Sequence, residues 1–291
     1  MKTNKQAIEK EGILYVCGTP IGNLKDMTFR ALEILKNVDL IAAEDTRHTK
    51  KLMNHFEIKK NLTSYHEHNK NEKAVYLIKV LKEGKKIALV SDAGMPCISD
   101  PGYVLVNEAI KEKIRIIPIP GVSAFLTALV VSGLVKDAFI FDGFLPRKKN
   151  DRKKYLKKNK NETRTIIIYE SPHRIKKTLS DMLEIWGNRK VAFARELTKK
   201  FEEIIRGTIS EVLNQIVRRE IKGEITLVIQ GSSESEEGLF KGMPVDEKIV
   251  DDYLADLKKK GYSNKEIIEI TKENIEIPKN IIYKKLLKLK Q

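Results

Sequence analysis

The sequence predicts an α/β protein with two α/β domains of similar size and a small helical segment after them. Short apolar stretches alternate with longer amphipathic stretches through the first 120 residues, and the same alternation begins again after residue 120. A polar stretch flanked by glycines, 231–238, then precedes three helical patterns. Alternation of strands and helices is typical of mainly parallel sheets covered by helices.

The first domain is expected to hold four clear strands, at residues 13–16, 38–43, 87–90 and 114–119. Between them, residues 28–37 and 73–83 carry apolar side chains three and four positions apart, which is the spacing of one helix face. Gly84 follows the second of these helices as a stop. We therefore expect helices that cover a parallel sheet.

The second domain is expected to begin with a helix at 122–132, followed by strands at 138–141, 165–169, 191–194 and 224–229. These patterns predict domains over residues 1–120 and 121–231, a solvated linker at 232–245 and a helical segment at 246–291. In that segment Ser263 and Glu266 have the spacing of a capping box, and Pro278 suits a helix start. A small helix-turn-helix-like module of this kind serves more often in packing or dimerisation than in reading bases.

The charge of the chain favours a polyanionic partner. Its 291 residues carry a formal net charge of +15, and such an excess attracts phosphates. Ten of these cations lie between Pro146 and Arg164, which predicts a basic surface for RNA backbone contacts, with Arg147, Lys148, Lys149 and Arg152 among them. The alternative is a solvated lysine loop without a partner.

The cysteines and the N-terminal residues exclude several classes of protein. Cys17 and Cys97 belong to no CxxC motif or Cys/His cluster, and no carboxylate pattern completes a metal site around His66 and His68. No signal core is visible, and no apolar stretch approaches the about 20 residues that cross a bilayer. We expect a cytoplasmic protein without a metal or a membrane segment.

The loop from Ser91 to Gly102 is the most informative feature of the chain. It follows an apolar strand and contains two Gly, two Pro and two Asp residues. Ligands of open parallel sheets bind outside the carboxyl ends of strands, where glycines let backbone N–H groups approach them. Asp92 is expected to accept hydrogen bonds from a ligand, whereas Asp100 is expected to cap the next helix.

Two further loops stand at predicted strand ends. Residues 18–23 follow the first strand, but they match neither GxGxxG nor a Walker motif, which argues against dehydrogenases and kinases. Residues 120–124 precede a helix whose N-terminal amides are suited to a carboxylate. Ser123 is alternatively only the N-cap of that helix.

Carboxylates and arginines also gather at strand ends, at 44–47, 169–174 and 195–199. Each group forms either a structural ion pair or part of a polar active-site wall. Arg174 and Arg195 are the first candidates for phosphate binding, because a guanidinium recognises phosphate with two hydrogen bonds.

Together these motifs resemble the S-adenosylmethionine-dependent tetrapyrrole methylase superfamily, and within it the enzymes that methylate a cytidine 2'-hydroxyl of 16S ribosomal RNA. The resemblance runs from about Gly12 to Gly231 and keeps the motifs in order. It implies a homodimer of two-domain subunits with the cofactor in the cleft between the domains. It implies an rRNA methyltransferase whose partner is 16S rRNA in the small ribosomal subunit.

The resemblance also implies roles for individual residues. The cofactor is expected to contact the loops after the first, third and fourth predicted strands, namely Thr19, Pro20, Gly22, Ser91, Asp92, Ala93, Gly94, Ser123 and Ala124. Candidates for a base that assists methyl transfer are Glu170, Glu44 and Asp45, and RNA is expected to contact Arg47 as well as the cations named above. Tetrapyrrole C-methylation and non-catalytic ribosome binding are the alternatives. The lack of a GPG-type first loop argues against the former, and the intact glycine loops argue against the latter.

Overall fold

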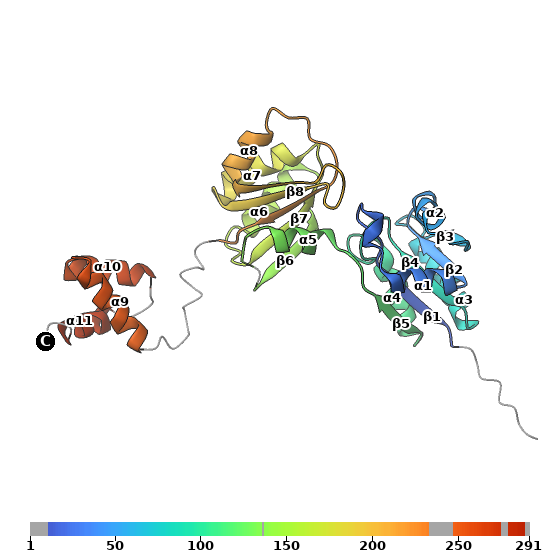
Figure 1. Ribbon diagram of the computed structural model, residues 1–291, viewed down its shortest axis with the longest axis horizontal. Helices are drawn as coiled ribbons and strands as arrows, with labels where there is room; N and C mark the ends of the chain where they lie inside the picture. The colour runs from blue at the N-terminus through green and yellow to red at the C-terminus, as the bar shows by residue number, and fades with distance from the viewer. Residues whose placement is uncertain (1–10, 136, 233–246, 275–278, 289–291) are drawn as a thin grey trace, which may run out of the picture.

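The computed structural model describes residues 11–135, 137–232, 247–274 and 279–288. Within these ranges the chain forms two five-stranded sheets, each with helices on both faces, and three C-terminal helices (Figure 1). The predicted α/β class with two domains and a helical C-terminal segment is confirmed.

The first sheet has the strand order β3-β2-β4-β1-β5, and all of its neighbours are parallel. Its strands are β1 (Ile13–Cys17), β2 (Leu40–Ala43), β3 (Leu62–Ser64), β4 (Lys86–Val90) and β5 (Arg115–Ile119). Four of them lie where the apolar stretches predicted. Strand β3 was not predicted, because its three half-buried residues at a sheet edge form no apolar run.

Helices α1 (Phe29–Asn37) and α2 (Thr46–His55) cover one face of this sheet, and α3 (Lys70–Lys82) and α4 (Gly102–Lys111) cover the other. The strands therefore bury side chains on both faces: Tyr15 and Cys17 pack with α1 and α2, while Leu14 packs with α3 and α4. This two-sided burial explains why the strands are continuous apolar runs.

The second sheet has the order β6-β7-β10-β8-β9. Only β6 and β7 are parallel, and the other pairs are antiparallel. The strands are β6 (Phe139–Phe144), β7 (Thr165–Glu170), β8 (Lys190–Arg195), β9 (Glu203–Thr208) and β10 (Ile225–Ile229). The edge strand β9 was not predicted, and its residues are only partly buried.

Helix α5 (Ala124–Val131) packs on one face of the second sheet. The other face is covered by α6 (Lys149–Lys158), α7 (Ile175–Trp186) and α8 (Ile209–Ile216). The lysine-rich stretch of the sequence thus contains a helix, α6, because Leu156 and the aliphatic part of Arg152 are buried beneath it. The indole N–H of Trp186 donates to the Leu156 carbonyl at 2.7 Å and ties α7 to α6.

The C-terminal helices are α9 (Glu247–Lys259), α10 (Asn264–Asn274) and α11 (Lys279–Lys288), and they share an apolar core of their own. The predicted capping box is confirmed: the Ser263 N–H donates to the Glu266 carboxylate at 2.8 Å, and the Glu266 N–H donates to Ser263 Oγ at 3.3 Å. Pro278 and residues 233–245 of the predicted linker lie outside the described residues. None of the described helices is long and apolar enough to cross a membrane.

The predicted domain boundaries stay predictions. The strand before the first boundary, β5, ends at Ile119, and the last strand of the second sheet, β10, ends at Ile229.

Candidate functional site

Three loops meet at the carboxyl edge of the first sheet, after β1, β4 and β5. Thr19 and Gly94 form an antiparallel bridge, with N–H to O distances of 2.9 and 3.1 Å, which joins the β1 and β4 loops. Gly18 lies against Gly121 so closely that a Cβ built on Gly18 would be 2.7 Å from the Gly121 Cα. The β1 and β5 loops therefore touch backbone to backbone, which only glycine permits at these positions.

The β4 loop is held by its own polar groups and by Tyr65. The Asp100 carboxylate accepts from the Cys97 N–H at 2.9 Å and from the Gly102 N–H at 2.7 Å, so it holds the loop together. Asp100 is not the predicted N-cap of α4, because Pro101 occupies that position. The Tyr65 hydroxyl accepts from the Leu105 N–H at 3.0 Å and donates to the Pro101 carbonyl. Cys97 and Ser99 have positive φ angles of 72° and 67°, a costly conformation that these bonds maintain.

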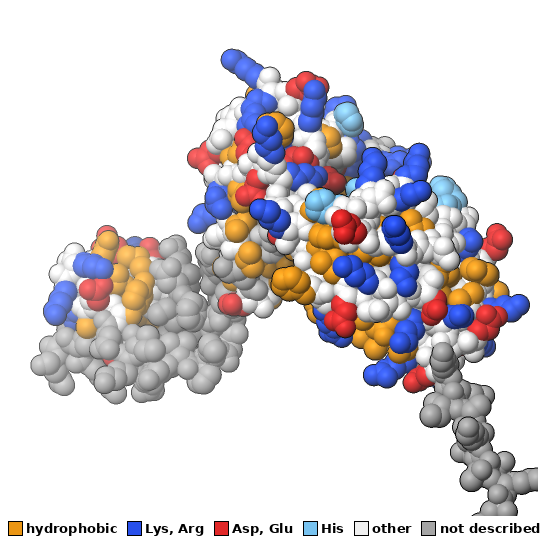
Figure 2. Space-filling view, turned by 45° about the vertical axis from the view of Figure 1, so that its right-hand side comes forward, with side chains coloured by type: hydrophobic (Ala, Val, Ile, Leu, Met, Phe, Trp, Pro, Cys, Tyr) orange, Lys and Arg blue, Asp and Glu red, His pale blue; other side chains and the backbone are white. Residues whose placement is uncertain are grey.

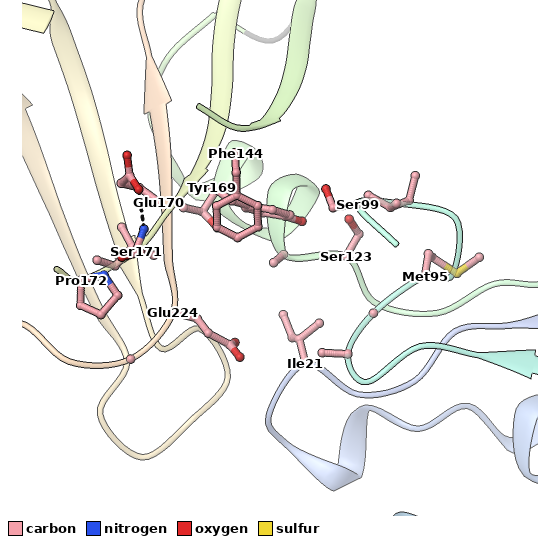
Figure 3. A pocket seen from close by; sticks show the side chains of 17 residues that line it. Ile21, Met95, Ser99, Ser123, Phe144, Tyr169, Glu170, Ser171, Pro172 and Glu224 are labelled. Carbon is pink, nitrogen blue, oxygen red and sulfur yellow. Dashed lines mark hydrogen bonds between the residues drawn. The ribbon is translucent and has the colours of Figure 1, made fainter. Parts of the chain in front are cut away.

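A cavity of about 360 Å³ opens beside these loops, between the two sheets (Figure 3). The first domain contributes the β1 and β4 loops to its wall, and the second contributes the ends of α5, β6, β7 and β10. Its lining is mainly apolar and includes Ile21, Ala93, Gly94, Met95, Ser123, Ala124, Phe144, Tyr169, Pro172, Glu224 and Thr226.

A second hollow of about 500 Å³ adjoins the cavity, because Ile21, Ala93 and Glu224 line both. Its wall is more polar and contains a lysine from each domain, Lys51 on α2 and Lys199 after β8, together with His48 of α2. The remaining lining residues are Thr19, Pro20, Gly22, Leu24, Leu52 and Asp92. An apolar chamber and a partly cationic chamber thus share one junction.

Direct contacts between the domains border the cavity. The Asn23 N–H donates to Thr198 Oγ1 at 3.1 Å, and a Cβ on Gly22 would lie 2.4 Å from the Lys199 Cγ. On another side, a Cβ on Gly143 of β6 would lie 3.3 Å from Ser99 Oγ. The β1 and β4 loops therefore contact the second domain at separate points around the cavity.

The carboxylates after β2 and β4 form an acidic group. Asp92 accepts from the Asp45 N–H at 2.9 Å. Burial raises the pKa of Glu44, and the nearby Asp92 and Asp100 carboxylates raise it further. Asp45 differs, because hydrogen bonds from the Arg47 side chain and backbone lower its pKa to about 2. Its carboxylate caps α2 by accepting from the Arg47 and His48 N–H groups.

Glu170 was predicted as a base, yet its carboxylate is fully buried and hydrogen-bonded at both oxygens. Oε1 accepts from the Ser171 N–H at 2.7 Å and from the Arg174 guanidinium at 2.6 and 2.9 Å, and Oε2 accepts from Thr178 Oγ1 at 2.6 Å. The carboxylate is turned away from the cavity centre in Figure 3. These bonds suit Glu170 to holding the β7 loop and Arg174 in place.

Three arginines predicted to bind RNA are instead engaged in ion pairs within the protein. Arg152 is the clearest correction, because it is only 4% exposed and its guanidinium donates to Asp181 at 2.6 and 2.8 Å. Arg174 pairs with Glu170, and Arg195 pairs with Glu203 at 3.0 Å and also donates to the Lys222 carbonyl. The sequence shows a cation at each position but not its distant carboxylate partner.

The other residues predicted from the sequence are distributed around the two chambers. Ala93, Gly94, Ser123 and Ala124 line the cavity, and Thr19, Pro20, Gly22 and Asp92 line the hollow. Ser91 is buried, and its hydroxyl lies 3.3 Å from the Ala93 carbonyl, inside the loop. Ser123 is the N-cap of α5 but makes no side-chain cap bond. Arg147, Lys148 and Lys149 are exposed.

Five lining residues were given no individual role from the sequence, although Met95, Tyr169 and Lys199 lie in strand-end segments that it indicated: Met95, Phe144, Tyr169, Lys199 and Glu224. Burial raises the pKa of Tyr169, whose hydroxyl accepts a backbone hydrogen bond from Phe125 at the start of α5. Glu224 forms an ion pair with Lys199 at the junction of the chambers, with 3.0 Å between Glu224 Oε2 and Lys199 Nζ. In the sequence, Glu224 is the first residue of the strand predicted at 224–229 and directly follows Gly223.

Within the described residues, no group of three His, Cys, Asp or Glu side chains is placed to hold a metal ion. His66 and His68 lie near each other after β3, with ring centroids 6.0 Å apart, and no carboxylate or cysteine completes a site around them.

Comparison with known proteins gives related sequences and related folds. Residues 13–213 match the family Tetrapyrrole (Corrin/Porphyrin) Methylases. Two proteins named ribosomal RNA small subunit methyltransferase I are similar over nearly the whole chain. The one from Halalkalibacterium halodurans is 51% identical over 97% of this chain and 98% of its own, and the one from Bacillus subtilis is 50% identical over 94% and 93%.

A third protein of that name, from Thermotoga maritima, is 51% identical over 99% of its own chain but 76% of this one. Among solved structures, diphthine synthase has a TM-score of 0.58 at 15% identity, over 75% of this chain and 89% of its own. Uroporphyrin-III-C-methyltransferase from Thermus thermophilus has a TM-score of 0.53 at 18% identity, over 76% and 94%. These two likenesses concern the fold. The family match and the full-length identities establish that the chain belongs to the tetrapyrrole methylase family, in the group of the ribosomal RNA small subunit methyltransferases I.

Proposed function

We propose that the chain transfers a methyl group from S-adenosylmethionine to a cytidine 2'-hydroxyl of 16S ribosomal RNA in the small ribosomal subunit. The observation that carries this proposal is the sequence identity of 51% and 50% to two proteins that are named for methylation of small-subunit rRNA, over almost their full length. The two adjoining chambers support it, because methyl transfer needs a donor site and an acceptor site side by side.

The cavity residues fit S-adenosylmethionine. Phe144 and Tyr169, with ring centroids 5.6 Å apart, and Ile21 offer apolar surface for an adenine ring. Gly94 leaves the backbone of the β4 loop accessible, and the N-terminal end of α5 is suited to a carboxylate. When bound, this cofactor supplies an electrophilic methyl group on a sulfonium.

The adjoining hollow is suited to the acceptor nucleotide. Lys51 and Lys199 supply positive charge for a phosphate, His48 supplies a ring N–H donor, and Leu24 and Leu52 supply apolar surface. The protein holds nucleophile and electrophile in line and excludes water, and neither task requires a metal. The ribose hydroxyl loses its proton as the new C–O bond forms.

Of the three carboxylates predicted as bases, Glu170 lines the cavity, whereas Glu44 and Asp45 line neither chamber. The raised pKa of Glu44 makes it a stronger base than an ordinary carboxylate, but no geometry places it beside the acceptor hollow. The lowered pKa of Asp45 makes that group a weak base, and the Glu170 carboxylate is engaged by Arg174, Ser171 and Thr178.

The decisive experiment is methyl transfer from labelled S-adenosylmethionine to small ribosomal subunits that lack the modification. We expect label on one cytidine ribose, located by nuclease digestion and mass spectrometry. Saturable cofactor binding without label on rRNA would show that the acceptor is wrong and would favour a tetrapyrrole carbon. Absence of cofactor binding in a calorimetric titration would favour a non-catalytic ribosome-binding protein.

We also propose that the subunit forms a homodimer through α5 and the start of β6. Leu126 and Val130, one turn apart on α5, are 45% and 63% exposed, and Val135 and Phe139 continue this apolar surface. An exposed apolar face of this kind is typical of a protein interface. Light scattering is expected to give twice the subunit mass of 33.3 kDa, and Val130→Glu is expected to lower it towards one subunit.

A further inference from the structure

Helix α2 follows strand β2 and borders the hollow of the candidate site. It begins directly after Glu44 and Asp45, and the Asp45 carboxylate caps it. Its sequence, TRHTKKLMNH, contains five basic or imidazole side chains and no acid. Thr49 and Met53 face the core, so the charged side chains lie along the two flanks of the helix.

One flank of α2 belongs to the proposed acceptor hollow. His48, Lys51 and Leu52 line it, opposite Lys199 and Glu224 of the second domain. Lys51 is exposed. Any strand whose ribose enters this hollow therefore passes beside Lys51.

The other flank lines a larger, open hollow of about 1160 Å³ beside the edge strand β3. Arg47 and Lys50 of α2 face it, together with Lys59 and Lys60 on the segment before β3. In Figure 2, Lys and Arg side chains gather with histidines along the top of the first domain. Cations thus continue from the acceptor hollow across α2 to the edge of the sheet.

These cations are poorly neutralised by the protein. Lys50, Lys51, Lys59 and Lys60 make no ion pair with any carboxylate in the described part of the chain. The one acid that lines the open hollow, Asp39, accepts from the Lys86 N–H at 2.8 Å and pairs with Lys85. Arg47 is bonded to Asp45 but remains 88% exposed. Arg152, Arg174 and Arg195, by contrast, are held by buried or half-buried carboxylates.

We propose that α2 is an RNA-binding ridge, which binds backbone phosphates on both flanks and places the acceptor ribose in the hollow beside Lys51. The proposal rests on the proposed function, since it assumes an RNA substrate. The surface of α2 carries flexible lysines, and each of them can contact one phosphate. A surface that binds a protein partner would be expected to be more apolar or to mix both signs of charge. Phosphate contacts give orientation rather than sequence discrimination, so α2 would position the strand.

The test compares Lys50→Gln/Lys51→Gln with a control of equal charge change, Lys79→Gln/Lys190→Gln. Lys79 lies on α3, on the opposite face of the first sheet, and Lys190 lies at the start of β8, the end of that strand away from the cavity; both are exposed. Binding to small ribosomal subunits is measured over a salt series, with calorimetric titration of S-adenosylmethionine and methyl transfer beside it.

We expect the α2 variant to bind small subunits about tenfold more weakly, with the slope of log K against log salt reduced by about 1 to 2, because each lost phosphate contact removes about one released counterion. Its KM for subunits should rise similarly, with cofactor affinity equal to that of the parent. An unchanged salt slope, or a loss equal to that of the control, would overturn the proposal. If the parent protein methylates no rRNA, the proposed function fails instead. An altered oligomeric state with unchanged RNA affinity would make this surface a protein interface.

Discussion

Replacing Gly121 by alanine is expected to reduce cofactor affinity at least tenfold, about 1.4 kcal/mol, and to abolish most methyl transfer. A Cβ at this position would lie 2.8 Å from the Gly18 Cα and 3.0 Å from the Gly18 carbonyl carbon. Both are backbone atoms of the β1 loop, so relief requires the β1 and β5 loops to move apart. That movement would displace Thr19 from its bridge with Gly94 and widen the cavity.

Calorimetric titration with S-adenosylmethionine and thermal unfolding together test this expectation. Gly261→Asn is the control, because Gly261, between α9 and α10, has a φ of 87°, which asparagine tolerates, and a Cβ there meets no atom within 4 Å. The control should bind the cofactor like the parent protein. If Gly121→Ala also binds it with parental affinity, the close contact between the loops does not shape the cofactor site.

The central strands of both sheets could be predicted because they are buried on both faces. In β7, Ile166 and Ile168 pack towards α6, α7 and α8, while Ile167 packs towards α5. Such strands are continuous apolar runs, so they can be predicted without knowing which strands lie beside them. The edge strands β5 and β6 were predicted because they contain apolar runs, whereas the edge strands β3 and β9 contain at most two consecutive apolar residues and carried no comparable signal.

The loops of the candidate site could also be predicted from the sequence, because the local backbone conformation requires their glycines and prolines. Gly94 has a φ of 78°, and Gly18 and Gly121 must be glycine to touch each other. What could not be predicted were contacts between distant segments. Tyr169 reaches the start of α5, and Lys199 crosses from the second domain to Gly22 of the first.

The charged residues also show that the sequence predicts local features but not contacts between distant residues. A basic residue in a sequence does not reveal whether a carboxylate far along the chain neutralises it. The guanidinium of Arg152 is bound by Asp181, 29 residues away, whereas Lys50 and Lys51 make no such pair among the described residues. The lysine-rich stretch of the sequence therefore predicted RNA binding at α6, whereas the lysines beside the acceptor hollow lie on α2.

The second large effect is expected at this buried ion pair. Arg152→Ala should lower the free energy of unfolding by about 3–5 kcal/mol, because it leaves the Asp181 carboxylate buried without its partner. The two side chains are 4% and 8% exposed and join α6 to α7. Lys153 lies 3.8 Å from the other Asp181 oxygen and cannot replace the two guanidinium N–H groups that donate to Oδ2. Urea unfolding followed by circular dichroism measures the change.

Two variants separate the buried pair from a general effect of lost charge. Arg147→Ala removes an exposed cation just before the same helix and should change stability by less than about 0.5 kcal/mol. Arg152→Met/Asp181→Leu removes both charges and fills the space with apolar atoms, so it should be more stable than Arg152→Ala, since no charge is left unpaired. An Arg152→Ala protein as stable as Arg147→Ala would contradict burial of the pair and would return Arg152 to the candidates for RNA binding. The predicted order, with the double variant above the single one, would mean that this arginine holds the second domain together and leaves the RNA to other cations.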